Sequence, residues 1–363
     1  MYKNLIYSIV LLNILLVSCE DVYRADLDSR ENLIVVESRI IVGENDNYVK
    51  LTETKGFNER EFFNAIKYAS VKIINSNNEA FELYEADSGI FKLYFPIDPN
   101  LQYKIQIKYQ EDTFESDFEK VPEEPYIDSI YGKLEVKTIE VDGENNVNNF
   151  NSAVGFQSYT DINGADSPYY FFTSRKILQY IYYKKEEGKP DSTFIGWDTE
   201  YPSGVYNIAG PPEKSDSNNI IKHPLFFFES TPQLQPGHVF YGWIFILYQY
   251  GITKSAYNYY ADLNKQLGSD GKLFDPMFVQ ARNNLKCITD PKKAIMGNFE
   301  ILSAKEYRYF IIDYKSPSDK LKKIPYYYDI PERGEILYIP ERGEILYFPD
   351  FWETPHKIYP NEN

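Results

Sequence analysis

Short runs of alternating apolar and polar residues, separated by turn-forming residues, begin at residue 33 and continue along most of the chain. In residues 102–109 (QYKIQIKY), tyrosine and isoleucine alternate with glutamine and lysine, which is the pattern of a strand with one buried face. Comparable runs predict strands at 33–42, 48–54, 71–74, 80–84, 89–95 and 114–118. This succession of short strands favours an immunoglobulin- or transthyretin-like β-sandwich over residues 33–122.

The segment 121–126 (VPEEPY) carries two prolines and two acids, which is typical of a domain boundary. A second, larger β-rich domain is expected over residues 123–358, followed by a tail at 359–363. Only residues 254–267 break the β pattern, because their apolar side chains recur at helical spacing between a capping threonine and a glycine. The other predicted strands of this domain are 133–141, 153–160, 169–183, 225–228, 239–250, 294–303 and 307–314.

The nonapeptide IPERGEILY at residues 330–338 is repeated without change at residues 339–347. One repeat does not make a solenoid, because such folds need at least three repeats to bury a core. We interpret residues 330–347 as an in-frame duplication, and we expect it in an exposed tail or loop, where inserted residues disturb no packing.

The first residues form a leader of a recognisable kind. The apolar run 5–17 is too short to span a membrane comfortably and ends in LVSC at residues 16–19, the lipobox pattern of bacterial lipoproteins. We therefore predict a signal peptide at 1–18, acylation of Cys19 with palmitate-type chains, and a polar tether at 19–32. The alternative is an ordinary signal peptide or signal anchor with a chance cysteine.

Composition narrows the possible partners. The chain has 54 acidic and 38 basic residues, and this net charge of −16 argues against binding to nucleic acid or adsorption to anionic lipid. Aromatic residues make up 17% of the chain, including 34 tyrosines, which suits pleated sheets. Once Cys19 is acylated only Cys287 remains, so no internal disulfide is possible, and we expect Cys287 to be a buried, inert thiol.

No motif predicts a catalytic residue or a cofactor. The three histidines do not share a metal-binding spacing, and neither a GxSxG elbow nor a phosphate-binding loop occurs. The only weak metal candidates are Asp161, Asn163 and Asp166, whose oxygens suit calcium. Their glycine lies at the wrong position for an EF-hand and no twelfth-position glutamate follows, so a solvated turn is the alternative interpretation.

Exposed aromatic rings are candidate platforms for sugars. Trp243 lies in an apolar predicted strand and is expected in the core. Trp197 lies in the irregular, glycine- and proline-rich stretch 184–222 and is the weak candidate for an exposed ligand-binding ring.

Five short motifs follow one another along the mature chain: LIVVE at 33–37, PYIDSI at 125–130, YTD at 159–161, GKLFDP at 271–276 and IMGNF at 295–299. With the lipobox, they resemble a Bacteroidota outer-membrane lipoprotein family that is classed as a domain of unknown function. The acidic residues Glu20 and Asp21 resemble the surface-export signal of such lipoproteins. Because genes of this family are typically found beside those of TonB-dependent receptors, the resemblance implies a receptor partner. The family has no established catalytic residues, so the resemblance assigns none to this chain.

Three functions follow as hypotheses. The first is a non-enzymatic, outer-membrane-anchored binding or assembly subunit that works with a TonB-dependent receptor in nutrient uptake. The second is a surface lipoprotein that binds glycans alone. The third is a hydrolase whose site is assembled from residues distant in sequence.

Overall fold

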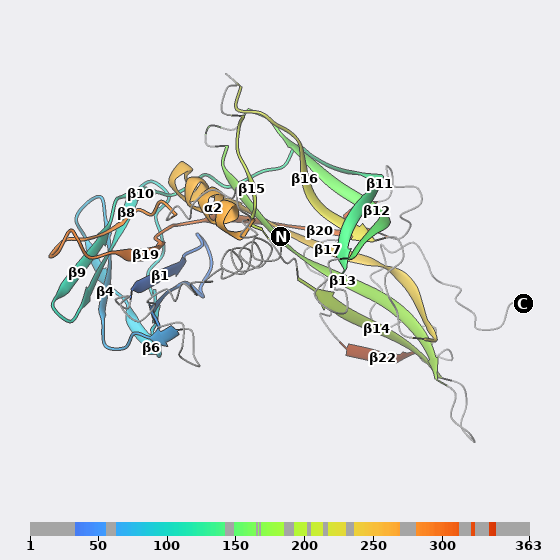
Figure 1. Ribbon diagram of the computed structural model, residues 1–363, viewed down its shortest axis with the longest axis horizontal. Coiled ribbons are helices and arrows are strands. Elements are labelled where there is room, and N and C mark those ends of the chain that lie inside the picture. Colours follow the sequence, from blue (N-terminus) through green and yellow to red (C-terminus); the bar gives the residue numbers. More distant parts are fainter. Residues whose placement is uncertain are drawn as a thin grey trace, which may run out of the picture.

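The computed structural model describes residues 33–55, 63–141, 149–164, 166, 168–184, 192–201, 205–212, 217–229, 236–268, 281–311, 321–323 and 334–338. Over these residues the chain is mainly β, as the sequence predicts. Figure 1 shows two groups of sheets arranged along the longest axis, with helix α2 (Lys254–Leu267) between them. We call the group that contains β1 the sandwich unit and the group that contains β13 the long-strand unit.

Two sheets enclose the core of the sandwich unit. The strand order of one is β19-β1-β2-β7-β6 with β3 beside β2, and that of the other is β18-β9-β8-β4-β5 with β10 beside β8. The first sheet contains β1 (Ile34–Arg39), β2 (Tyr48–Thr54), β3 (Phe63–Ala65), β6 (Tyr84–Asp87), β7 (Ile90–Lys92) and β19 (Ile295–Asn298). The second contains β4 (Ser70–Asn75), β5 (Ala80–Glu82), β8 (Gln102–Tyr109), β9 (Asp112–Ser116), β10 (Glu119–Lys120) and β18 (Leu285–Cys287).

Alternation along the strands explains this packing. In β4 and β8 every second side chain is buried, and the apolar residues of both sheets join one cluster, among them Val36, Leu51, Ile73, Ile105 and Ile107. A period of two directs one set of side chains inwards and leaves the other in water. The arrangement is consistent with the sandwich that the sequence predicts.

The strands β18 and β19 belong to the sandwich unit, although they lie far along the chain from its other strands. The sequence places residues 285–298 in the second domain, yet β19 pairs in parallel with β1 and β18 pairs antiparallel with β9. Leu285, Cys287 and Ile295 are buried in the core of the sandwich unit. Strands of three or four residues carry too little pattern to reveal which sheet they join, so only the packing shows that this unit needs both parts of the chain.

The long-strand unit also has two sheets facing one core. One has the order β11-β12-β16 and the other β21-β20-β17-β13-β14-β22, with β15 beside β13. Phe156, Phe228, Trp243 and Phe245 are buried between the two sheets. The strands are β11 (Ser129–Val141), β12 (Asn149–Ile162), β13 (Tyr170–Lys184), β14 (Ser192–Glu200), β15 (Asn207–Ala209), β16 (Ile220–Glu229), β17 (His238–Gly251), β20 (Ser303–Ile311), β21 (Leu321–Lys323) and β22 (Gly334–Tyr338).

Helix α2 occupies the residues that the sequence predicts. The hydroxyl of Thr253 accepts a hydrogen bond from the N–H of Ala256 at 3.2 Å, which caps the first turn. Near the other end, the guanidinium of Arg282 donates to both carboxylate oxygens of Asp262, at 2.6 and 3.0 Å. This bidentate contact fastens the helix to the chain that returns to the sandwich unit. Within the described residues no helix is long and apolar enough to cross a membrane.

A small cluster joins the two units. Ile41, two residues after β1, and Leu302, just before β20, are buried together with Ile252 and Ala256. The N–H of Val42 donates to the carbonyl of Leu302 at 2.8 Å, so backbone pairing continues across the junction. The turn after β1 is therefore held against the centre of the molecule.

The first copy of the nonapeptide differs from expectation. Its residues Gly334–Tyr338 form β22, which pairs with β14 at the edge of the sheet rather than lying in a tail or loop. The alternation in GEILY is compatible with a strand, and the open edge of β14 supplies the partner. The leader, Cys19, the tether, the second copy at 339–347 and the tail at 359–363 lie outside the described residues.

Candidate functional site

A groove of about 540 Å³ opens between the turn after β1 and the segment after β7. Its walls are residues 42–45 and 47 on one side and residues 93–97 on the other, and we call it the Tyr94 groove. Both walls follow strands of the same sheet, so the core of the sandwich unit fixes their separation.

The amide of Asn47 shapes the first wall. Asn47 is 6% exposed, and its Oδ1 accepts from the N–H of Ile41 at 2.8 Å. Its Nδ2 donates to the carbonyls of Ile41 and Glu44, each at 3.0 Å. An amide side chain carries both donors and an acceptor, so one residue satisfies both ends of the turn. Gly43 turns the backbone with φ of +84°, which glycine adopts at little cost.

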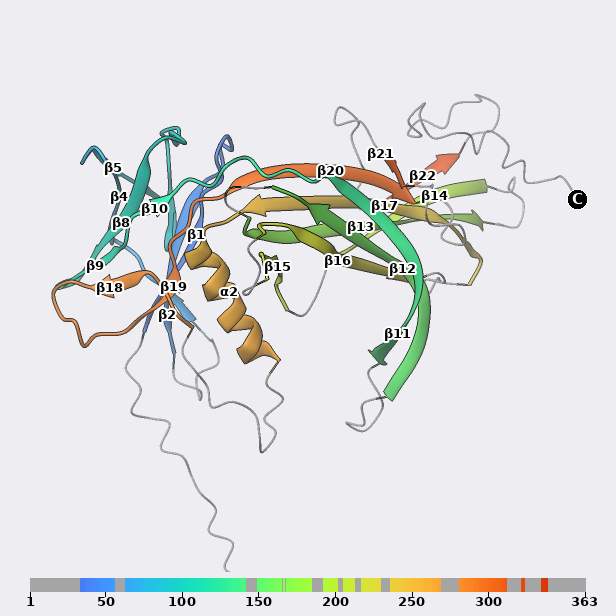
Figure 2. The ribbon, with the colours of Figure 1, turned by 90° about the horizontal axis from the view of Figure 1, so that it is seen from above.

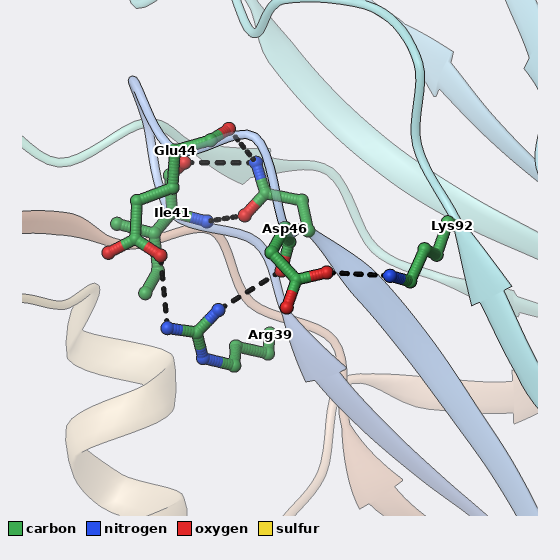
Figure 3. A network of polar contacts seen from close by, with 6 residues as sticks. Arg39, Ile41, Glu44, Asp46 and Lys92 are labelled. Atoms are coloured by element: carbon green, nitrogen blue, oxygen red, sulfur yellow. Dashed lines mark hydrogen bonds and ion pairs between the residues drawn. The ribbon is translucent and has the colours of Figure 1, made fainter.

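Ion pairs hold the outside of the same turn (Figure 3). The guanidinium of Arg39 donates to the carbonyl of Asp46 and to Oε2 of Glu44, both at 3.0 Å. Lys92 donates to Oδ1 of Asp46 at 2.8 Å, and this hydrogen bond lowers the pKa of Asp46 and raises that of Lys92. Exposed pairs of this kind add little stability singly, so their main effect is on the shape of the turn.

Aromatic rings build the second wall. Tyr94 is 77% exposed, and its ring stacks on that of Tyr84 with centroids 3.9 Å apart. A hydrogen bond with Tyr84 raises the pKa of Tyr94 to about 12, so the phenol stays protonated at physiological pH. Phe95 stacks on Phe81 at 4.1 Å behind it. A flat ring fixed beside the polar groups of Glu44 suits a ligand with one apolar face and a polar edge.

A second pocket of about 510 Å³ lies beside β18 and β19. Two of its three lysines are engaged, because Lys286 pairs with Asp117 at 2.9 Å and Lys293 pairs with Asp112. Cys287 is 4% exposed there, and its sulfur accepts from the N–H of Asp290 at 3.4 Å. The thiol is buried, as the sequence predicts.

The weak metal candidates lie at the end of β12 and in the turn that follows it. Asp161 is the penultimate residue of β12, and its carboxylate accepts hydrogen bonds from the hydroxyls of Tyr131 and Ser129 and, at 2.6 Å, from the N–H of Lys222. Asn163 and Asp166 are exposed in the turn that follows. In the described ranges no group of three or more histidine, cysteine, aspartate or glutamate residues is arranged to hold a metal ion. The carboxylate of Asp161 therefore serves to join the strands around it.

The structure corrects the interpretation of Trp197. This residue lies in β14 and is only 3% exposed, so its ring offers no open face to a sugar. The surrounding stretch looked irregular in sequence, but residues 192–200 form a strand that pairs with β13. Trp243 is 2% exposed in the core, as expected, and Trp352 lies outside the described residues.

Sequence reasoning missed Tyr94. The side chains of Phe91 and Leu93 are buried, and Tyr94 faces solvent two residues before Pro96. The run reads as one aromatic strand, and nothing in it distinguishes a surface ring from a core ring. The one available signal is the alternation itself, which places Tyr94 on the same outward face as Lys92.

His223 is a structural residue. Its Nε2 lies 2.7 Å from Oδ1 of Asn207, and its ring stacks on Phe172. Burial lowers the pKa of His223 to about 4, so the ring is neutral at physiological pH.

The sequence matches one known protein family. The family model described as "Domain of unknown function (DUF4249)" matches residues 20–308. The chain belongs to this family. No curated protein and no solved structure matches it. The match to this DUF4249 protein covers all of the described sandwich unit and the long-strand unit as far as β20, so its membership rests on both units.

Proposed function

We propose that this DUF4249 protein is an outer-membrane lipoprotein, anchored through Cys19, that acts as a non-enzymatic binding or assembly subunit beside a TonB-dependent receptor in nutrient uptake. The observation that carries the binding role is the Tyr94 groove, an open site whose ring and turn are already held in place. The charged groups on its rim are ion-paired, which suits recognition better than acid–base chemistry.

The anchor supports the same proposal. The lipobox at residues 16–19 predicts acylation of Cys19, and two or more acyl chains attach a protein stably to a bilayer. A tether at 19–32 could extend about 45 Å, at roughly 3.3 Å per residue, before the sandwich unit begins. That reach lets the unit contact a neighbouring receptor, while the net charge of −16 keeps it from adsorbing to anionic lipid.

Copurification tests the partner. The full-length chain, expressed from its native locus and extracted in mild detergent, is expected to bring a TonB-dependent barrel protein with it. The Cys19→Ala variant is expected in the soluble fraction, folded but without the barrel. Wild-type protein that elutes with no barrel would rule out the receptor partner. A Cys19→Ala variant that stays fully membrane-bound would rule out anchoring through Cys19.

The exposed ring of Tyr94 favours one alternative, a stand-alone glycan-binding lipoprotein. On a glycan array, Tyr94→Ala is expected to weaken binding about tenfold, the size of a lost stacking contact of about 1.4 kcal/mol. Tyr68→Ala is the matched control, because Tyr68 is 92% exposed on the same unit and does not line the groove. Empty profiles for the wild type and both variants would end the glycan hypothesis.

A further inference from the structure

Among the described strands, β11 has an outer edge that is open over an unusual length. β11 covers thirteen residues, Ser129–Val141, and pairs with β12 over its whole length, from Ser129 opposite Asp161 to Val141 opposite Asn149. In the part of the chain that the structure describes, no strand pairs with its other edge. Typical strands have about 5–6 residues, and a long open edge is a ready template for another strand.

This part of the hairpin is also apolar. Leu134 is 42% exposed, Val136 67% and Val154 51%, and the register places Val136 directly opposite Val154. By alternation these three residues share the face that carries Phe156 into the core. Figure 2 shows the hairpin curving away from the sheet of β13, β17 and β20, so its apolar face extends beyond the core. An exposed apolar strand edge suits a partner strand.

The charges on the opposite face indicate which strand fits. Lys133, Glu135 and Lys137 alternate in sign along β11. In an antiparallel pair centred on Leu134, Lys133 of each copy lies opposite Glu135 of the other, and the two Leu134 side chains meet. Centring the pair on Glu135 would instead oppose like charges, which is destabilising. Centring it on Val136 would oppose Glu135 and Lys137, but the ammonium of Lys137 already donates to Gln157 and lies over the ring of Phe227. The sequence of β11 is therefore complementary to itself when the pair is centred on Leu134.

We propose that β11 pairs antiparallel with β11 of a second copy, about a two-fold axis at Leu134, and joins the two β11-β12-β16 sheets into one continuous sheet. A two-fold interface uses the same surface twice, which requires the self-complementarity found here. This interface lies on the long-strand unit, whereas the Tyr94 groove lies on the sandwich unit, so it does not depend on the proposed function.

Cysteine cross-linking in the full-length, membrane-anchored protein tests the axis. Opposed Cα atoms of antiparallel strands lie about 4.5–5.5 Å apart, within the range that a disulfide bridges. Leu134→Cys is expected to give a disulfide-linked dimer under mild oxidation. Val154→Cys is the matched control, because it is similarly exposed on the same face but would lie more than three strand spacings, or about 14 Å, from its counterpart. The wild type gives the background from Cys19 and Cys287.

Charge reversal tests the register in the Leu134→Cys background. Lys133→Glu and Glu135→Lys each place like charges opposite one another, and each is expected to lower the dimer yield at least tenfold. The double variant restores opposite charges and is expected to restore the dimer, with circular dichroism confirming the fold of all three. Equal yields for Leu134→Cys and Val154→Cys, cross-linking to a different protein, or no recovery in the double variant would overturn the proposal.

Discussion

At Gly297 the backbone adopts φ of +93° while the residue is paired with Val36 in the neighbouring strand. A Cβ at this position would lie 1.9 Å from the carbonyl oxygen of Val36, a distance that no side chain tolerates. The obstacle is backbone rather than a flexible side chain, so β19 would have to move away from β1. Glycine is required here by a contact between residues far apart in sequence.

We expect Gly297→Ala to lower the free energy of unfolding by about 3 kcal/mol or more, the sum of left-handed strain and a backbone clash. Gly237→Ala is the matched control, because Gly237 has φ of +87° and open space around the added carbon. That variant should lose only about 1 kcal/mol. Denaturant unfolding of both proteins measures the difference, and equal losses would show that the contact with Val36 is unimportant.

Individual elements were predictable where a local signal marked both ends. Helix α2 begins after Thr253 and ends before Gly268, the two residues that the sequence identifies as its cap and its stop. The predicted strand at 80–84 is instead split into β5 and β6 at Leu83, whose N–H donates to Val71 across the sheet. Long-range pairing of this kind has no local signal, so strand boundaries were less predictable than the helix.

Because β18 and β19 complete the sandwich unit, the first part of the chain should not fold stably without them. A fragment of residues 33–122 is expected to lack cooperative thermal unfolding, because it exposes the core that the returning segment covers. Each buried apolar side chain contributes about 1.5–3 kcal/mol, against a total stability of about 5–15 kcal/mol for a typical domain. The buried side chains that the fragment lacks are Leu285, Cys287, Ile295, Phe299 and Ile301.

Adding the missing segment is the control for that prediction. The same fragment joined through a flexible linker to residues 281–302 should recover a cooperative transition by circular dichroism. A cooperative transition in the shorter fragment would show that the first part of the chain is an independent domain, as the sequence suggested.

At the scale of the whole molecule, a buried carboxyl group lies where the two units meet. Glu300 is 5% exposed, and its Oε1 accepts a hydrogen bond from the hydroxyl of Tyr260 on helix α2. Its backbone N–H donates to the hydroxyl of Ser38 at 2.8 Å, which ties it to β1. Burial, reinforced by the nearby carboxylate of Glu119, raises the pKa of Glu300 to about 7. The stability of the junction between the two units is therefore expected to depend on pH through Glu300.

The sign of the pH effect follows from that shift. Below pH 4.5 Glu300 is protonated in both the folded and the unfolded chain. Between pH 4.5 and about 7 it ionises only in the unfolded chain, so the contribution of Glu300 to stability is lost as the pH rises through this range. Glu300→Gln keeps an acceptor for Tyr260 and should stabilise the protein at pH 8 by about 2–3 kcal/mol relative to the wild type. Glu111→Gln, at an exposed position, is the control. Parallel stability profiles from pH 4 to 8 for the wild type and Glu300→Gln would contradict this.

The sequence by itself determined the mainly β class, the period-two strands of the sandwich unit, the bounds of helix α2 and the burial of Cys287. Each of these follows from residues close together along the chain. Only the tertiary structure decided that β18 and β19 belong to the sandwich unit, that Trp197 is buried, and that Tyr94 faces a groove. Those outcomes depend on which surfaces of distant segments meet, and no local pattern of side chains specifies that.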